Sequence, residues 1–241
     1  MALLEVERVS KRFGGLQAVN GASFTVEEGS VVSLIGPNGA GKTTLFNLVS
    51  GFLRPDAGDI RFQGRSIVGL RPHSICEMGL VRTFQLVKPF RHLSVLENVM
   101  VGAYHRVRNP AAAADRARAA LAFVGLLERA GMRAADLTTS EQRRLEVARC
   151  LATGPRLLLL DEVMAGLNPT EVDGMIGLVR RIAAAGVTVL LIEHVMRAVM
   201  AISERVVVLH HGEIIAQGLP QEIVRHPKVV EAYLGEEAML A

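Results

Sequence analysis

The chain has 241 residues, 50% of them hydrophobic, which is enough for one substantial core or a core with a small appended lobe. A formal net charge of +3 allows an acidic ligand or an anionic surface but does not argue for nucleic acid. Two cysteines without a Cys-x-x-Cys pair, and no apolar window near the ~20 residues that span a bilayer, argue against a disulfide framework, a zinc site and a membrane-spanning or exported protein.

The first predicted elements are strands. Apolar and polar residues alternate in FTVEE (24–28) and DIRFQG (59–64), which predicts half-buried strands of an antiparallel sheet. Three other runs, VVSLIG (31–36), RLLLLDE (156–162) and VTVLLIEH (187–194), are short, continuous and aliphatic. Such runs are typical of central strands of a parallel sheet that is buried on both faces.

Helices are predicted between these strands. A helix should begin near Lys42, with one apolar face made of Leu45, Leu48, Val49 and Phe52. Between Pro72 and Gly154 the pattern becomes mostly helical, with a capping box in SVLE (94–97) and an Ala-rich helix over 111–131. We therefore expect a helical lobe, at about residues 86–154, inserted into an α/β core.

The remaining patterns are weaker. VVVLHHGEIIAQG (206–218) predicts a hairpin near the end of the chain. The helical lobe carries several arginines with only Tyr104 as a nearby aromatic, namely Arg106, Arg108, Arg116, Arg118, Arg129 and Arg133. A solvated helix face is favoured over an RNA-binding patch, because proteins that bind single strands interleave stacking aromatics with their charges. No nucleic acid partner is predicted.

The segment GPNGAGKTT (36–44) lies between a predicted strand and a predicted helix, and it matches the phosphate-binding pattern G-x-x-x-x-G-K-[ST]. Its glycines let successive backbone amides converge on phosphate oxygens, helped by the positive end of the following helix. Lys42 adds charge toward the β- and γ-phosphates, and Thr43 supplies a hydroxyl to Mg²⁺. The residues predicted to bind nucleotide here are Gly36, Asn38, Gly39, Ala40, Gly41, Lys42, Thr43 and Thr44.

Acidic side chains and a histidine end the neighbouring strands. Asp161 is predicted to hold Mg²⁺, and Glu162 to polarise the attacking water. His194 ends the next aliphatic run and should emerge at the same edge of the sheet, within reach of the γ-phosphate and the water. The alternatives are an acidic pair that faces solvent and a structural histidine.

With these motifs the chain resembles the ATP-binding subunits of ABC transporters over nearly its whole length. The resemblance implies a P-loop NTPase core with a mainly parallel sheet, an N-terminal antiparallel β subdomain and an inserted helical subdomain, all within one ABC ATPase domain spanning 1–241. It further implies that Phe13 in KRFGG stacks on adenine, and that Gln85 in VRTFQ touches Mg²⁺ and reports nucleotide state to the membrane subunit. Asn168 in AGLNPTE would lie in a loop at the dimer interface, and His194 would be the switch histidine.

Within that family, the phosphate loop, VRTFQ, AGLNPTE, LLIEH and the tail AYLGE look most like the ATPase subunit of the high-affinity branched-chain amino acid importers. The likeness implies a peripheral ATPase at the cytoplasmic face of the inner membrane that powers import of branched-chain amino acids or related small polar solutes. Its partners would be membrane permease subunits, a second ATPase subunit, different or identical, and indirectly a solute-binding protein. The alternatives are a non-transport ABC-type ATPase, a lipopolysaccharide exporter ATPase and a P-loop kinase.

The family's Leu-Ser-Gly-Gly-Gln-like signature, which contacts the γ-phosphate bound by the opposite chain, is altered here. Thr138, Thr139 and Ser140 stand where Ser-Gly-Gly would, and Glu141 replaces the glutamine. The added Cβ atoms hinder close backbone approach, and an inward carboxylate would repel phosphate. T-x-x-E is also a capping-box pattern. The segment is therefore either a weakened trans element, meaning a weakened contact to the nucleotide bound by the opposite chain, or only a helix cap. Val163 and Val195 also depart from the family's usual proline and aspartate, and Asn168 from its usual aspartate.

Overall fold

The computed structural model describes residues 1–85 and 88–239, the side chains of 234–239 excepted. An antiparallel sheet occupies the N-terminal part, with the strand order β2 (Leu16–Glu27), β1 (Ala2–Phe13), β4 (Ala57–Phe62) and β5 (Arg65–Ser66). The strands predicted from FTVEE and DIRFQG lie in β2 and β4. The prediction of an N-terminal antiparallel sheet is confirmed.

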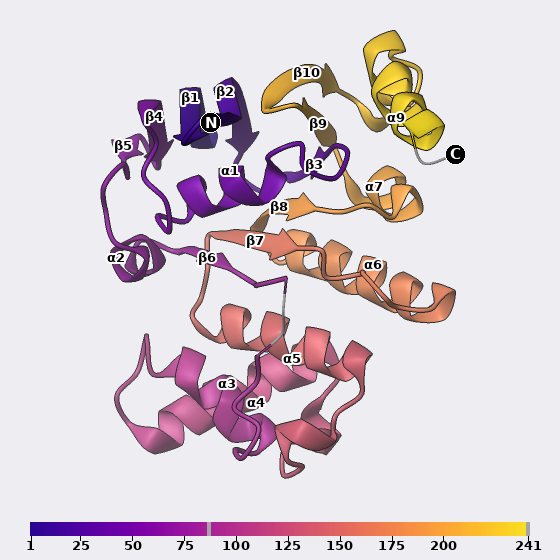
Figure 1. Cartoon of the computed structure of the whole chain (residues 1–241). Coiled ribbons are helices and arrows are strands. Elements are labelled where there is room, and N and C mark those ends of the chain that lie inside the picture. Colours follow the sequence, from indigo (N-terminus) through magenta and orange to yellow (C-terminus); the bar gives the residue numbers. More distant parts are fainter. Residues whose placement is uncertain (86–87, 240–241) are drawn as a thin grey trace.

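A second, mostly parallel sheet forms the centre of the molecule (Figure 1). Its strand order is β10 (Glu213–Gly218), β9 (Arg205–His210), β3 (Val31–Ile35), β8 (Thr188–Ile192), β7 (Leu157–Asp161) and β6 (Leu80–Arg82). Only the β9–β10 hairpin is antiparallel. The three aliphatic runs are β3, β7 and β8, so the prediction of a parallel core sheet is confirmed.

Helices bury both faces of this sheet. On one face, α1 (Lys42–Val49) lies between the two sheets, and Leu157 and Leu159 pack in the same core as Leu45. On the other face lie α6 (Pro169–Ala184) and α7 (Met196–Ile202), and Leu158 and Leu160 point into that core. Every residue of β3, β7 and β8 is buried, so their only charged side chain, Asp161, stands at a strand end, and Ser33 is the one polar residue in a strand interior.

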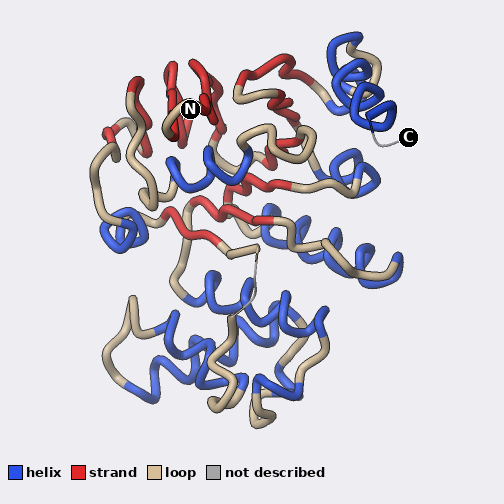
Figure 2. The backbone as a smooth tube through the Cα atoms, in the orientation of Figure 1, coloured by secondary structure: helices blue, strands red, loops and turns tan. Residues whose placement is uncertain are grey.

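The helices α3 (Val95–Ala103), α4 (Pro110–Val124) and α5 (Thr139–Ala152) pack on one another on one side of the strands (Figure 2). The predicted capping box is present at the start of α3, where Ser94 Oγ accepts from Glu97 N and Glu97 Oε2 accepts from Ser94 N. The first two residues of the predicted helical lobe, 86 and 87, lie outside the described part of the chain. The helical pattern read from Pro72 onward also contains β6, which belongs to the sheet.

Two predicted helices end earlier than expected. Helix α1 stops at Val49 because Gly51 takes a left-handed conformation, φ +76°, and Phe52 is 51% exposed rather than on the buried face. The predicted helix over 111–131 ends at Val124, where Gly125 is the left-handed cap, and a short 3-10 turn, Leu127–Arg129, follows. In both cases a glycine determines where the helix ends, although the apolar spacing continues beyond it.

The predicted solvated arginine face is present, since five of the six arginines are exposed and Arg116 is half-buried, and two of them also bind backbone. Arg106 Nε and Arg116 Nε donate to the carbonyls of Thr153 and Ala152 at 2.6 and 2.5 Å, so both guanidinium groups satisfy the carboxyl end of α5. Positive groups at that end also complement the helix dipole.

The remaining helices are α2 (Pro72–Glu77), α8 (Pro220–Ile223) and α9 (Pro227–Met239). None of the helices within 1–85 and 88–239 combines the length and apolar character needed to cross a bilayer.

Glu193 is a buried carboxyl group that links two strand ends. It follows β8, is 1% exposed, and its Oε1 accepts a hydrogen bond from Met164 N at 2.9 Å. The backbone amides of His194 and Val195 also donate to the carboxylate. Burial raises the pKa of Glu193 to about 7, although these three amides oppose the rise. The side chain therefore joins the segment after β7 to the segment after β8.

This pKa predicts a pH-dependent stability. Between the ordinary glutamate pKa of about 4.3 and a pKa of about 7, the folded chain holds a proton that the unfolded chain has lost, so stability falls as pH rises. The effect is on the order of 3 kcal/mol. We expect Glu193→Gln to flatten the loss of Tm from about pH 5 to about pH 8 in thermal unfolding followed by circular dichroism. Exposed Glu128→Gln should keep the wild-type slope, and equal slopes in wild type and Glu193→Gln would contradict the assignment.

Candidate active site

The phosphate loop follows β3 and lies against neighbouring backbone. A Cβ atom on Gly36 would lie 2.0 Å from the carbonyl oxygen of Leu209, and one on Gly41 would lie 2.2 Å from that of Ala18. Both residues also have positive φ, +151° and +102°. The loop can therefore approach β9 and β2 this closely only with glycine at these two positions.

Lys42 begins α1 and turns back into the loop. Its side chain is buried, and Nζ donates to the carbonyl oxygens of Gly36 and Pro37 at 2.7 Å each. Gly41 is the N-cap of α1, so the helix presents unpaired amides and the positive end of its dipole toward the loop. A buried ammonium and a helix start at one place favour an anionic ligand.

A cavity of about 590 Å³ lies over the loop. Its lining includes every residue predicted to bind nucleotide except Gly36, together with Phe13 from the end of β1, Gln85 and Glu162. Phe13 is 44% exposed, so its ring is open to a flat partner. His211 also lines the cavity. No sequence pattern pointed to His211, because its position depends on the β9–β10 turn lying beside the loop, where Gly212 N donates to Ala40 O.

A second cavity of about 680 Å³ adjoins the first, because Thr43 and Gln85 line both. Asp161 lines this second cavity. The three residues predicted as metal ligands are therefore brought together, although they come from α1, the segment after β6 and the end of β7.

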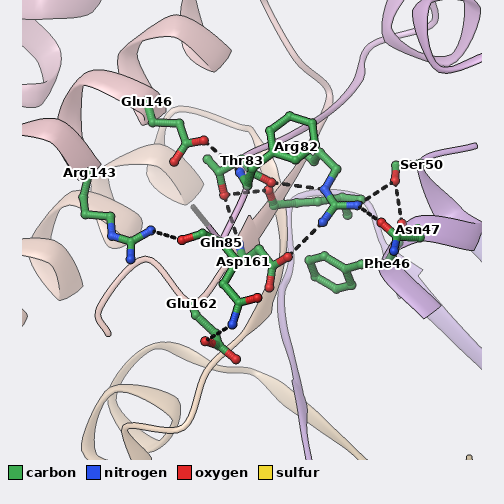
Figure 3. Close-up of polar contacts among 12 residues, drawn as sticks. Phe46, Asn47, Ser50, Arg82, Thr83, Gln85, Arg143, Glu146, Asp161 and Glu162 are labelled. Atoms are coloured by element: carbon green, nitrogen blue, oxygen red, sulfur yellow. Dashed lines mark hydrogen bonds and ion pairs between the residues drawn. The ribbon is translucent and has the colours of Figure 1, made fainter. Parts of the chain in front are cut away.

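Glu162 is the meeting point of three strand ends. His194 Nε2 lies 2.8 Å from Glu162 Oε1. Gln85 Nε2 donates to Glu162 Oε2 at 2.9 Å, as Figure 3 shows. Glu162 has a left-handed backbone, φ +50°, a conformation that costs energy for a residue with a side chain and that is found mainly at functional sites. Both oxygens of this carboxylate are thus held in fixed positions beside the cavity.

Asp161 is buried and its two oxygens differ. Oδ2 lies 2.8 Å from Arg82 Nη2, in an ion pair whose side chains are 1% and 6% exposed. Oδ1 has no hydrogen-bond partner among the described residues. Burial raises the pKa of Asp161, and the charge of Arg82 opposes that rise. Arg82 lies in VRTFQ, but only the glutamine of that motif has a predicted role, so no sequence signal marked this arginine.

The altered signature forms the first turn of α5. Thr138 is the N-cap: Oγ1 accepts from Glu141 N at 3.3 Å, and Glu141 Oε2 accepts from Thr138 N at 2.9 Å. Arg129 Nε donates to Glu141 Oε1 at 3.2 Å. These hydrogen bonds to the backbone, and the charge of Arg129, lower the pKa of Glu141. The capping box predicted as one alternative is present, and neither cavity is lined by Thr138, Thr139, Ser140 or Glu141.

Asn168 has a similar local role. It is exposed and caps α6, where Oδ1 accepts from Glu171 N at 3.0 Å and Glu171 Oε2 accepts from Asn168 N at 2.9 Å. Its predicted role at a dimer interface is compatible with this exposure but stays a prediction.

Comparison with known proteins agrees with this site. The model of the ABC transporter family matches residues 19–165, and that of the branched-chain amino acid ATP-binding cassette transporters matches 213–239. The high-affinity branched-chain amino acid transport ATP-binding protein BraF of Pseudomonas aeruginosa is 45% identical over 97% of this chain and 98% of its own length. For LivG of Salmonella typhimurium, of the same description, the identity is 44% with the same coverage.

A solved structure has the same fold. The ADP conformation of an ATP-binding cassette of an ABC transporter matches with a TM-score of 0.89 at 32% identity, over 98% of this chain and 99% of the other. The agreement therefore extends from the phosphate loop to the whole fold. The chain belongs to the ABC transporter family, as an ATP-binding subunit that hydrolyses ATP.

Proposed function

We propose that this chain works at the cytoplasmic face of the inner membrane and powers import of branched-chain amino acids or related small polar solutes. The solute would cross through separate membrane permease subunits, supplied by a solute-binding protein. The names of the two relatives at 44% and 45% identity support this solute class over a lipopolysaccharide exporter or a non-transport ATPase. We further propose that residues 1–241 form one ABC ATPase domain with the helical subdomain at 86–154.

The nucleotide would occupy the 590 Å³ cavity. Its adenine would stack on the half-exposed ring of Phe13, and its phosphates would lie in the loop from Gly36 to Thr44. Lys42 would then exchange its two carbonyl partners for phosphate oxygens and balance their charge. The observation that carries the proposal is that one cavity gathers the loop, Gln85 and Glu162.

The residues present fit Mg²⁺. Asp161 Oδ1 is a buried carboxylate oxygen without a hydrogen-bond partner among the described residues, and Thr43 and Gln85 line the same cavity with oxygen ligands. Magnesium prefers oxygen and is usually held by one or two protein carboxylates together with substrate phosphates. Bound there, it would neutralise charge on the β- and γ-phosphates.

Glu162 would act as the general base. Its carboxylate would accept a proton from the attacking water, while His194 and Gln85, each bound to one oxygen, keep it oriented. Lys42 and the loop amides would stabilise the charge on the transferring phosphoryl group. Val163 in place of the usual proline and Val195 in place of the usual aspartate leave these contacts intact.

Glu162→Gln tests this role. The amide has nearly the same shape but cannot accept the proton, so ATP turnover should fall at least about a hundredfold while ATP binding persists. Phosphate release and equilibrium binding of ATP measure the two effects. With partner subunits present, the variant should trap ATP and elute as a dimer in gel filtration. Exposed Glu128→Gln should behave as wild type, and a variant at 162 with undiminished turnover would refute the assignment.

The first turn of α5 suggests a second chain. It does not line its own chain's cavities, and Thr138 and Thr139 are exposed, so any contact with phosphate would be made to a nucleotide on another chain. Glu141 is folded onto its own helix end, which favours a weakened trans element. We propose that the partner is a different, homologous ATPase subunit with an intact signature. This chain's nucleotide would then face the intact signature, and the partner's nucleotide would face Thr138–Glu141.

That arrangement predicts unequal sites. In the mixed dimer, Glu162→Gln in this chain should remove most ATP turnover, because it disables the site completed by the intact signature. The corresponding Glu→Gln in the partner should leave most of the turnover. Turnovers per dimer, counted for the two single variants, the double variant and Glu128→Gln, measure the asymmetry. Equal losses from the two single variants, meaning two equally fast sites, would contradict the weakened signature.

A further inference from the structure

Arg82 has more partners than any motif assigns to it. Its Nη2 donates to Asp161 Oδ2 at 2.8 Å, and its Nη1 donates to Asn47 Oδ1 at 2.6 Å and to Ser50 Oγ at 3.2 Å (Figure 3). Its Nε donates to Thr83 O at 3.1 Å. One planar guanidinium on β6 therefore joins the far end of α1 to the carboxylate that ends β7.

Three aromatic rings surround this guanidinium. The centroids of Phe84, Phe52 and Phe46 lie 4.9, 5.7 and 5.9 Å from Arg82 Cζ, and Phe52 and Phe84 meet edge to face at 5.6 Å. Phe52 and Phe84 are half-exposed, whereas the Arg82 side chain is 6% exposed. The rings thus cover the guanidinium and add cation–π attraction, so it is fixed on several sides.

The ion pair makes the two oxygens of Asp161 unequal. Oδ2 is bound by Arg82, and Oδ1 is buried with no hydrogen-bond partner in the described part of the chain. A buried ion pair of this kind is weak support for stability, and an unpaired buried oxygen is costly. A residue that binds one oxygen of a carboxylate and leaves the other for a metal has the arrangement found around metal ligands.

We propose that Arg82 is the positioning residue for Asp161, fixing the carboxylate so that its second oxygen is presented for Mg²⁺. This inference rests on the proposed ATP site. Arg82 does not touch nucleotide in this scheme, since none of its contacts is with the phosphate loop and it does not line the cavity above it. It acts through Asp161 alone. The opposite possibility is that Arg82 competes with Mg²⁺ for Asp161 and that its positive charge repels the metal.

Arg82→Met separates the two possibilities because it removes the charge and keeps much of the side-chain volume. A non-hydrolysable ATP analogue is bound to the purified full chain by titration calorimetry, first in EDTA and then at increasing MgCl₂. If Arg82 positions Asp161, the Mg²⁺ concentration for half-maximal enhancement of binding should rise at least about tenfold, and affinity in EDTA should stay at the wild-type value. A competitor would instead give a lower Mg²⁺ requirement.

Asn47→Ala provides a second variant that leaves both charges in place. It removes the 2.6 Å anchor of Nη1, so the Mg²⁺ requirement should shift in the same direction by a smaller factor. Arg118→Met, which removes an exposed guanidinium paired with Asp115, should leave the requirement unchanged. If Arg82→Met fails to fold in thermal unfolding, Asn47→Ala decides the question.

An unchanged or lower Mg²⁺ requirement in the deciding variant would overturn the role of Arg82. If the wild-type chain bound the analogue neither in EDTA nor in MgCl₂, the proposed ATP site itself would be overturned. The two failures are therefore distinguishable within one set of titrations.

Discussion

The burial of the parallel sheet on both faces is the constraint from which the active site follows. Since α1 covers one face and α6 and α7 cover the other, the strands β3, β7 and β8 carry a charged side chain only at an end, and the hydroxyl of Ser33 is the one polar side chain in their interior. Parallel strands run the same way, so these ends meet at one edge. The phosphate loop, Asp161, Glu162 and His194 are neighbours for that reason. These groups can act together because the aliphatic sheet places them at the same edge.

Three carboxylates at this edge are held by three different kinds of partner. Glu193 is bound by backbone amides and carries a raised pKa, Asp161 is bound by a buried guanidinium, and Glu162 is bound by a neutral amide and an imidazole. Each partner suits a different task. Amides fix the path of the two loops, an arginine holds one oxygen of Asp161 and leaves the other unpaired among the described residues, and the amide and imidazole hold Glu162 beside the cavity.

The sequence predicted the elements with strong local signals. An uninterrupted aliphatic run specifies a buried strand, and G-x-x-x-x-G-K-[ST] specifies a loop, whatever surrounds them. It failed where a single residue overrides a periodicity, as Gly51 does before Phe52 and Gly125 does after Val124. It also did not identify Arg82 and His211. Arg82 matters through its ion pair with Asp161, and His211 through its place beside the phosphate loop, which the hydrogen bond from Gly212 N to Ala40 O brings about; no local spacing encodes these long-range arrangements.

The start of α5 caps its own helix, and in the proposed dimer it would also have to contact a nucleotide on another chain, for which it is less suited. A helix N-terminus attracts anions because its first amides are unpaired. Here Glu141 already supplies a carboxylate to Thr138 N, and Arg129 balances its charge. An incoming phosphate would have to displace this internal anion or bind beside it, through the exposed hydroxyls of Thr138 and Thr139 and the guanidinium of Arg129. In the proposed dimer, the same capping box that stabilises the helix would therefore lower its affinity for a nucleotide on another chain. In a dimer with one such helix and one glycine-rich signature, the capping box would stabilise the helix of this chain. The glycine-rich signature of the partner would support fast hydrolysis of the nucleotide bound by this chain.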